Sequence, residues 1–340
     1  MIGEICVKNE ISIIKIAAMF MIIGCHLSEW LGINIIAMVL NVGVEIFLFV
    51  SGYLYSNRNI GKTKNFLGKK FLKICIPTYI AFIILAIANI LIFRKSYFNM
   101  TPVYLFNLQG INFIINKISP PVLDALGQLW FMTVIFINYL LLAVVKKYEK
   151  NTFWMDNKKV FVTFVVSFFI SIALVFSGIN MCYTFIFFVG YAYGKNETKM
   201  TGIKYIILTS LMILAMCGRI IARRYFDGSI LYNDIIVIYT HMILGTWIIV
   251  TIQFFYCKNK KVIDKICETR IWKTLNAYTM PIYLSHYPFL VGNFNVSRLG
   301  LGIGIELAIF VIATIALAYL IKQISGTIYR IASNRTLLMN

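Results

Sequence analysis

Long apolar runs constrain the fold of this 340-residue chain more than any other feature of its sequence. A run of roughly 17–25 apolar residues crosses the hydrocarbon core of a bilayer as a helix. Because lipid offers no hydrogen-bond partners, only helices and closed barrels satisfy their backbone there. Ten runs approach or reach this length, at about 12–31, 36–55, 74–93, 129–145, 160–177, 181–194, 204–221, 233–256, 276–292 and 303–321. The sequence therefore predicts an all-α, polytopic membrane protein with about ten transmembrane helices.

The composition leaves little chain for anything else. Hydrophobic residues make up 60% of the chain and charged residues 13%, whereas soluble domains are about 45–50% apolar and about 25% charged. We therefore expect one membrane-embedded domain over residues 1–340, without a separate soluble domain. The seven cysteines show neither a CxxC pair nor the spacing of metal ligands, so no metal site is expected.

The basic residues indicate how the chain is oriented in the membrane. The formal net charge of +19 would suggest a nucleic-acid partner in a soluble protein. Here 25 of the 32 Lys and Arg residues fall in the two termini and in alternate loops between the predicted spans. The positive-inside rule places such segments in the cytoplasm. We expect cytoplasmic N- and C-termini, a bilayer as the surrounding partner, and no nucleic acid.

Ionisable side chains inside predicted spans are candidate functional residues, because they are costly in lipid and usually face the bundle interior. They are Lys15, His26, Glu45, Asp234, His241, His286 and Glu306. The imidazole of His26 is suited to moving a proton near neutral pH. The alternative is a structural histidine that bonds a neighbouring carbonyl or hydroxyl group.

Lys15 and His26 share one helix face. Eleven steps of 100° return to within about 20° of the starting direction, and at 1.5 Å per residue they cover roughly 16 Å along the axis. Lys15 then lies near the cytoplasmic edge of the first span, and His26 lies deep within it. The alternative for Lys15 is a side chain that extends to the lipid headgroups.

Glu45 lies in the second predicted span, which a short connection makes an antiparallel neighbour of the first. Counted from the outer edge, His26 is about five residues deep and Glu45 about nine, a difference of roughly 6 Å. A carboxylate at that depth can orient the imidazole and stabilise its cation, as the third member of a catalytic triad does. A structural ion pair with a lysine is the alternative.

Two further features stand out on sequence grounds. The basic cluster Lys69-Lys70-Phe71-Leu72-Lys73 runs into the third span and can bind phosphates, although on sequence grounds ordinary positive-inside charge is the favoured explanation. His286 falls in the ninth predicted span, where Pro281 and Pro288 break or kink the helix. His241 is interpreted as structural, and the segment 94–128 is expected to carry an interfacial or re-entrant helix.

At these residues the chain resembles the acyltransferase-3 family of integral membrane acyltransferases. The family opens with an arginine, ten residues and a histidine, a spacing matched here by Lys15 and His26. An acidic residue often precedes this pair in the family, where Ser12 stands here. Lysine keeps the positive charge of the family's arginine but lacks its planar bidentate fork.

Four later patterns carry the same resemblance over nearly the whole chain. They are Gly43-Val44-Glu45-Ile46-Phe47 with Ser51-Gly52-Tyr53, the basic run before Pro77, Leu129-Trp130-Phe131, and Ile282-Tyr283-Leu284-Ser285-His286. By resemblance, His26 and Glu45 are the catalytic candidates, and Lys15, Lys70 and Lys73 would contact the phosphates of CoA. The candidates for substrate binding are Ser51, Tyr53, Trp130, Tyr283 and His286.

The resemblance implies transfer of an acyl group, usually acetyl, from cytoplasmic acyl-CoA to a hydroxyl group of an extracytoplasmic glycan or lipid-linked sugar. His26 would act either as general base or as transient acyl carrier, and both roles stay open. The expected location is the bacterial cytoplasmic membrane. Two alternative functions remain. One is a transporter of a small solute such as an amino acid, because midplane polar groups and broken helices are also transporter features. The other is a polysaccharide polymerase or flippase. The acyl chain, the acceptor sugar and the oligomeric state are not determined by the sequence.

Overall fold

The computed structural model describes residues 2–94, 101–110, 126–149, 151–196 and 201–337. Throughout these ranges the regular structure is helical and contains no strand, which confirms the predicted all-α class. The helices are α1 (Ile2–Trp30), α2 (Asn34–Leu40), α3 (Gly43–Tyr55), α4 (Thr63–Phe93), α5 (Thr101–Leu105), α7 (Trp130–Tyr148), α8 (Asn151–Met155), α9 (Asn157–Phe176), α10 (Cys182–Lys195), α11 (Gly202–Phe226), α12 (Val237–Lys258), α13 (Lys260–Glu268), α14 (Arg270–Ser285) and α15 (Ile303–Leu337). Short 3₁₀ turns η2 (Gly127–Leu129), η4 (Tyr287–Phe289) and η5 (Val296–Leu299) and the π-helix η3 (Leu231–Ile236) complete them.

Eight helices within the described ranges are long and apolar enough to cross a membrane. They are Asn9–Trp30, Asn34–Tyr55, Thr63–Phe93, Gly127–Tyr148, Asn157–Phe176, Gly202–Phe226, Leu231–Lys258 and Ile303–Ala332. These helices match eight of the predicted spans and establish a polytopic membrane protein. The other two predicted spans coincide with the shorter helices α10 and α14, of 14 and 16 residues. Ten crossings and cytoplasmic termini therefore stay predictions.

Several helices extend beyond the apolar runs that revealed them. Helix α4 begins at Thr63, well before the predicted start at 74, and α15 continues to Leu337. A helix does not need to end where the membrane does, because lysine and arginine are good helix formers in the aqueous flanks. In the segment 94–128 the described part contains the five-residue helix α5 and the start of η2. Residues 111–125 of this segment lie outside the described residues, so the expected interfacial or re-entrant helix stays a prediction.

The chain divides into two compact units, which are described in turn. The first unit comprises Met1–Ile22, Val39–Ile60 and Val144–Asn276. The second unit comprises Ile23–Met38, Gly61–Ala143 and Ala277–Asn340. The long helix α1 contributes its first part to one unit and its last two turns to the other.

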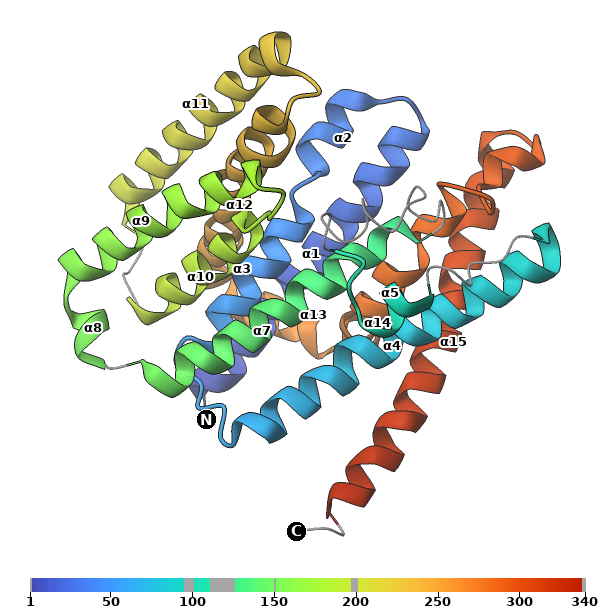
Figure 1. The fold of residues 1–340 in the computed structure, drawn as a ribbon, viewed down its shortest axis with the longest axis horizontal. Coiled ribbons are helices and arrows are strands. Elements are labelled where there is room, and N and C mark those ends of the chain that lie inside the picture. Colours follow the sequence, from blue (N-terminus) through green and yellow to red (C-terminus); the bar gives the residue numbers. More distant parts are fainter. Residues whose placement is uncertain (1, 95–100, 111–125, 150, 197–200, 338–340) are drawn as a thin grey trace. The chain divides into compact units, whose positions relative to one another are not determined.

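In the first unit, α3 packs closely against α10, and α12 packs against both α3 and α11 (Figure 1). Glycines permit the α3–α10 crossing. A Cβ atom on Gly52 would collide with the backbone oxygen of Phe187, and one on Gly190 with that of Phe49. Small residues allow helix backbones to approach closely in membranes, where packing replaces the hydrophobic driving force.

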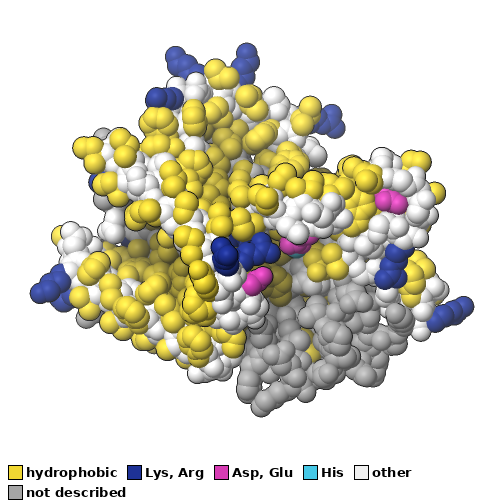
Figure 2. Space-filling model, turned by 90° about the horizontal axis from the view of Figure 1, so that it is seen from above, with side chains coloured by type: hydrophobic (Ala, Val, Ile, Leu, Met, Phe, Trp, Pro, Cys, Tyr) yellow, Lys and Arg dark blue, Asp and Glu magenta, His cyan; other side chains and the backbone are white. Residues whose placement is uncertain are grey.

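The outer helices of this unit present apolar side chains to their surroundings. Ile206, Leu214 and Ile221 of α11 are each more than 60% exposed. In Figure 2, hydrophobic side chains likewise cover most of the described surface on the face shown. Such continuous apolar exposure is not compatible with a water-facing surface and fits contact with lipid.

In the second unit, α15 packs against α4 (Figure 1). It also contacts η4 and η5. A core cluster forms where the end of α1 meets these turns. Leu290, Val296 and Phe310 are almost fully buried there, with Leu27 and Trp30 packed against them. This cluster fixes the last turn of α1 against the segment that follows η4, and so supports the candidate site described next.

Candidate active site

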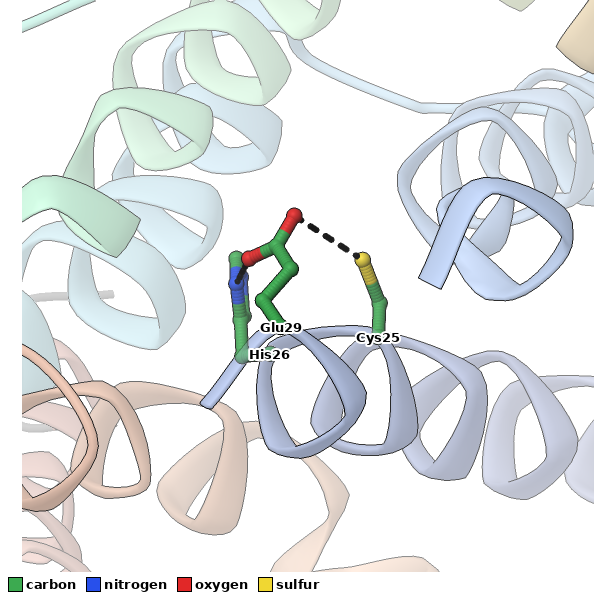
Figure 3. A group of neighbouring side chains, drawn as sticks. All are labelled: Cys25, His26 and Glu29. Carbon is green, nitrogen blue, oxygen red and sulfur yellow. Dashed lines mark hydrogen bonds and ion pairs between the residues drawn. The ribbon is translucent and has the colours of Figure 1, made fainter. Parts of the chain in front are cut away.

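His26 lies on the last two turns of α1 and shares its helix face with Glu29, three residues later. The distance between His26 Nδ1 and Glu29 Oε2 is 3.0 Å, and Cys25 Sγ donates to Glu29 Oε1 at 3.7 Å (Figure 3). Because a carboxylate only accepts hydrogen bonds, the proton of the neutral imidazole is assigned to Nδ1. His26 Nε2 is then the nitrogen with a lone pair, which is the form that a general base requires.

A second imidazole lies against the first. The rings of His26 and His286 are stacked, with centroids 5.4 Å apart, and Tyr287 meets His26 edge-on at 5.0 Å. His286 is fully buried, and its Nδ1 donates to the backbone oxygen of Tyr283 at 2.7 Å. Among the described residues no partner is found for His286 Nε2. The structure thus brings the predicted site residue His286 into contact with His26.

Tyr283 helps to fix this arrangement. Its hydroxyl group donates to the backbone oxygen of Gln128 at 2.7 Å, and the side chain of Gln128 donates to the backbone oxygen of Leu284 at 2.8 Å. These reciprocal bonds join the end of α14 to η2. The ring of Tyr283 also lies 5.6 Å from that of Phe131 and 5.8 Å from that of His286. Through these contacts Tyr283 holds the backbone that carries His286.

The His26–Glu29 pair opens on a cavity of about 540 Å³, a size that accommodates a small-molecule ligand. Apolar and polar side chains share its wall. The lining residues are His26, Glu29, Trp30, Leu31, Leu290, Val291, Asn295, Ser297, Ile303 and Glu306. The side chain of His26 is 24% exposed and that of Glu29 is 51% exposed. Both functional groups are therefore accessible to a molecule in the cavity.

Cys25, His26 and Glu29 also form a group whose potential metal-ligating atoms lie within 4.8 Å of one another. All three come from one helix, at adjacent and fourth-neighbour positions. Hydrogen bonds from Cys25 and His26 account for both oxygens of Glu29. The three side chains therefore form a hydrogen-bonded acid–base group.

The three lysines predicted to contact CoA do not all belong to one unit: Lys70 and Lys73 lie in the second unit and Lys15 lies in the first. Lys70 Nζ lies 3.5 Å from the ring centroid of Tyr139, and Lys73 Nζ lies 5.9 Å from that of Tyr329, both in the second unit. Lys73 is exposed and Lys70 is half-buried. In the first unit, Lys15 Nζ donates to Asn276 Oδ1 at 3.5 Å, which is a weak bond at that length.

The remaining predicted binding residues have mixed surroundings. Ser51 and Tyr53 are half-buried on α3 in the first unit, where the ring of Tyr53 lies 5.9 Å from that of Tyr193. Trp130 is half-buried at the start of α7 in the second unit, with its ring 6.2 Å from that of Phe131. A substrate-binding role for these three residues stays a prediction.

Glu45 has a different partner from the one that its depth suggested. Its Oε1 lies 3.3 Å from Nδ1 of His241, whose Nε2 is hydrogen-bonded to Arg219. All three residues are buried in the first unit, with exposed fractions of 4%, 1% and 5% for Glu45, His241 and Arg219. Within the second unit, the carboxylate bonded to His26 is Glu29. Depth along a helix does not determine which way the helix is rotated, so a catalytic role for Glu45 stays a prediction.

Sequence reasoning also missed Glu29, Arg219 and Asn295. Glu29 carried a usable signal, because residues at i and i+3 on a helix are neighbours. It stands at the outer edge of the first apolar run. Arg219 lies buried within the span formed by α11. Asn295 follows the ninth predicted span in a segment without local pattern.

Outside the spans, Glu149 forms a cluster of ion pairs. It bonds Lys146 at 3.2 Å, Lys195 at 3.3 Å and the hydroxyl group of Tyr191 at 2.5 Å. Burial acts to raise the pKa of Glu149. The hydrogen bonds from Tyr191 and Lys146 and the charges of the two lysines outweigh burial and leave the pKa below its usual value. Lys146 also donates to the backbone oxygen of Ser56 at 2.8 Å, which joins α7 to the end of α3.

Comparison with known families assigns this arrangement to an enzyme class. The acyltransferase-3 family profile, described as an acyltransferase domain, matches residues 8–323. The chain belongs to the acyltransferase-3 family. The match covers every candidate residue named above, and together with the apolar helices it identifies a multi-pass membrane acyltransferase. No curated protein and no solved structure gives a significant match to the chain.

Proposed function

We propose that this acyltransferase is a transmembrane O-acyltransferase that moves an acyl group, most often acetyl, from cytoplasmic acyl-CoA to a hydroxyl group of an extracytoplasmic glycan. One observation carries the proposal. The imidazole of His26 has its Nδ1 held by Glu29 and faces a cavity of about 540 Å³. A histidine oriented by a carboxylate is the arrangement that activates hydroxyl nucleophiles in acyl transfer.

In the general-base form of the reaction, His26 Nε2 removes the proton of the acceptor hydroxyl as its oxygen attacks the thioester carbonyl. The tetrahedral intermediate collapses with cleavage of the C–S bond, and the imidazolium returns the proton to the CoA thiolate. Glu29 stabilises the imidazolium that forms between these steps. In the carrier form, Nε2 itself attacks the thioester carbonyl, the C–S bond breaks, and CoA leaves as the thiolate. The acceptor hydroxyl then attacks the acyl carbon, the C–N bond to Nε2 breaks, and the hydroxyl proton neutralises the thiolate. Both forms use the same nitrogen.

Donor binding is proposed at the basic residues that match the family pattern. Lys15, Lys70 and Lys73 would attract the phosphates of CoA at the cytoplasmic surface, since ammonium groups bind phosphates as point charges. The eleven-residue interval on the continuous helix α1 separates Lys15 from His26 by roughly 16 Å along the axis. CoA can span such a distance, because an extended arm separates its phosphates from its thioester. The proposed location is the bacterial cytoplasmic membrane.

The purified protein in proteoliposomes, supplied with radiolabelled acetyl-CoA and a surface-glycan acceptor, provides the test. His26→Gln should lower the rate of ester formation at least about 10³-fold, and Glu29→Gln about 10²-fold, consistent with the loss of general-base catalysis. Asp227→Asn, on an exposed loop, is the matched control and should match the wild type. Normal transfer by His26→Gln would refute the assignment. Solute uptake that is indifferent to acyl-CoA would instead favour a transporter.

A further inference from the structure

The cavity beside His26 has an unusual charge distribution for a site in so basic a protein. Two carboxylates, Glu29 and Glu306, line it, whereas no Lys or Arg does among the described residues. Arg298 neighbours the lining residue Ser297 in sequence, but it is exposed and lies outside the lining. The cavity is therefore acidic in a chain whose formal net charge is +19.

Glu306 is held firmly in this wall. It lies in the first turn of α15, is 6% exposed, and its Oε1 accepts a hydrogen bond from the backbone N–H of Leu301 at 3.1 Å. An acidic group is favourable at this end of a helix, where the N–H groups and the helix dipole present positive charge. Glu306 is thus a fixed acceptor on the wall of the cavity, where a ligand hydroxyl or ammonium group can donate to it.

Asn295 and Trp30 supply the complementary groups. Asn295 Oδ1 accepts from Trp30 Nε1 at 3.1 Å and from the N and Oγ atoms of Ser297, each at 2.9 Å. No described residue accepts from Asn295 Nδ2, which leaves its two N–H groups as donors for a ligand. The bond to Asn295 also fixes the indole of Trp30, whose ring is only partly buried.

Carboxylate acceptors, an amide donor and an immobilised indole match the surface of a hydroxylated ring. Hydroxyl groups donate to the carboxylates and accept from the amide, while the C–H face of the ring packs on the indole. A negatively charged ring substituent would be repelled by Glu29 and Glu306, and no described Lys or Arg lines the cavity to compensate. Like charges that face each other in a partly dehydrated site are a strong device for rejection.

We propose that this cavity is the acceptor subsite and that it selects a hydroxylated ring that is neutral or carries an amino group, against rings that carry a carboxylate or phosphate. This inference rests on the proposed function, since it assumes that the acceptor hydroxyl approaches His26 from the cavity. Glu306 is the specificity-determining residue, because Glu29 is already engaged with His26. The selectivity comes from charge and is independent of which sugar the ring belongs to.

Ester formation from acetyl-CoA should be measured with methyl glycosides of gluco, galacto and manno configuration, each as the neutral sugar and as the matching uronic acid. The full-length protein in proteoliposomes should favour the neutral member of the best pair at least tenfold in kcat/KM. Glu306→Gln keeps the shape and the acceptor for Leu301 but removes the charge, and should reduce that preference at least fivefold. Arg298→Gln is the control and should leave the preference unchanged.

The outcomes separate the inference from the function on which it rests. Equal or faster transfer to the uronic acids by the wild type overturns the charge selectivity alone. The same holds if Arg298→Gln reduces the preference for the neutral sugar and Glu306→Gln leaves it unchanged. The wild-type ratio decides the matter even if Glu306→Gln fails to fold. Absence of transfer to every glycoside, in a preparation that is folded and binds acetyl-CoA, overturns the proposed function together with the inference.

Discussion

Glu45→Gln separates a structural role for this carboxylate from a catalytic one. Glu45, His241 and Arg219 form a buried chain in the first unit, in which a carboxylate and a guanidinium flank one imidazole. Glutamine has nearly the same shape and can still bond His241, so the substitution removes only the negative charge. The buried chain would then keep its guanidinium but lose its carboxylate charge.

The expected magnitude follows from the loss of this buried negative charge. Removing one partner of a buried ion pair costs about 3–5 kcal/mol, and the retained hydrogen bond favours the lower end of this range. A loss of about 3 kcal/mol corresponds to a factor of roughly 150 in the unfolding equilibrium constant. Asn196→Ala, at an exposed helix end, is a suitable control and should change the stability little.

The measurement is reversible unfolding in mixed micelles with increasing SDS, followed by loss of helical circular dichroism. The double variant Glu45→Gln with Arg219→Met should lose less stability than the two single variants summed, because it removes both opposite charges of the chain together. Additive effects would show that the two charges are not coupled. Full stability of Glu45→Gln with acyl transfer abolished would refute this reasoning and support the catalytic role predicted from the sequence.

Two further predictions concern the basic surface. Lys70→Met should raise the KM for acetyl-CoA about tenfold with little change in kcat, as loss of one charge-assisted bond to a phosphate implies. Lys70→Arg should restore KM in that assay. An unchanged KM in Lys70→Met would refute the contact with CoA and favour a structural role for Lys70, which lies over the ring of Tyr139. Glu149→Gln should lower thermal stability at pH 7, because the pKa of Glu149 lies below its usual value of 4.5 in the folded protein. Its stabilisation is then present above pH 4.5 and lost as the pH falls through the folded pKa, so melting curves of variant and wild type should converge in acid.

The sequence determined the class of the protein and its first catalytic candidate. Apolar length is a local property, so the long runs identified eight helices that the structure contains. The interval between Lys15 and His26 depends only on helix periodicity, and the ordered motifs led to the family that the profile match confirms. Glu29 was within reach of the same local reasoning, since it lies three residues after His26 on one helix.

Only the tertiary structure decided how the polar groups pair. His286 stacks on His26 and Glu45 bonds His241 although each pair is far apart along the chain. Helix rotation and the packing of whole helices set such contacts, and the local pattern of apolar residues does not specify either one when nearly every face is apolar. The acidic wall formed by Glu29 and Glu306 arises in the same way, from the end of one helix and the first turn of another.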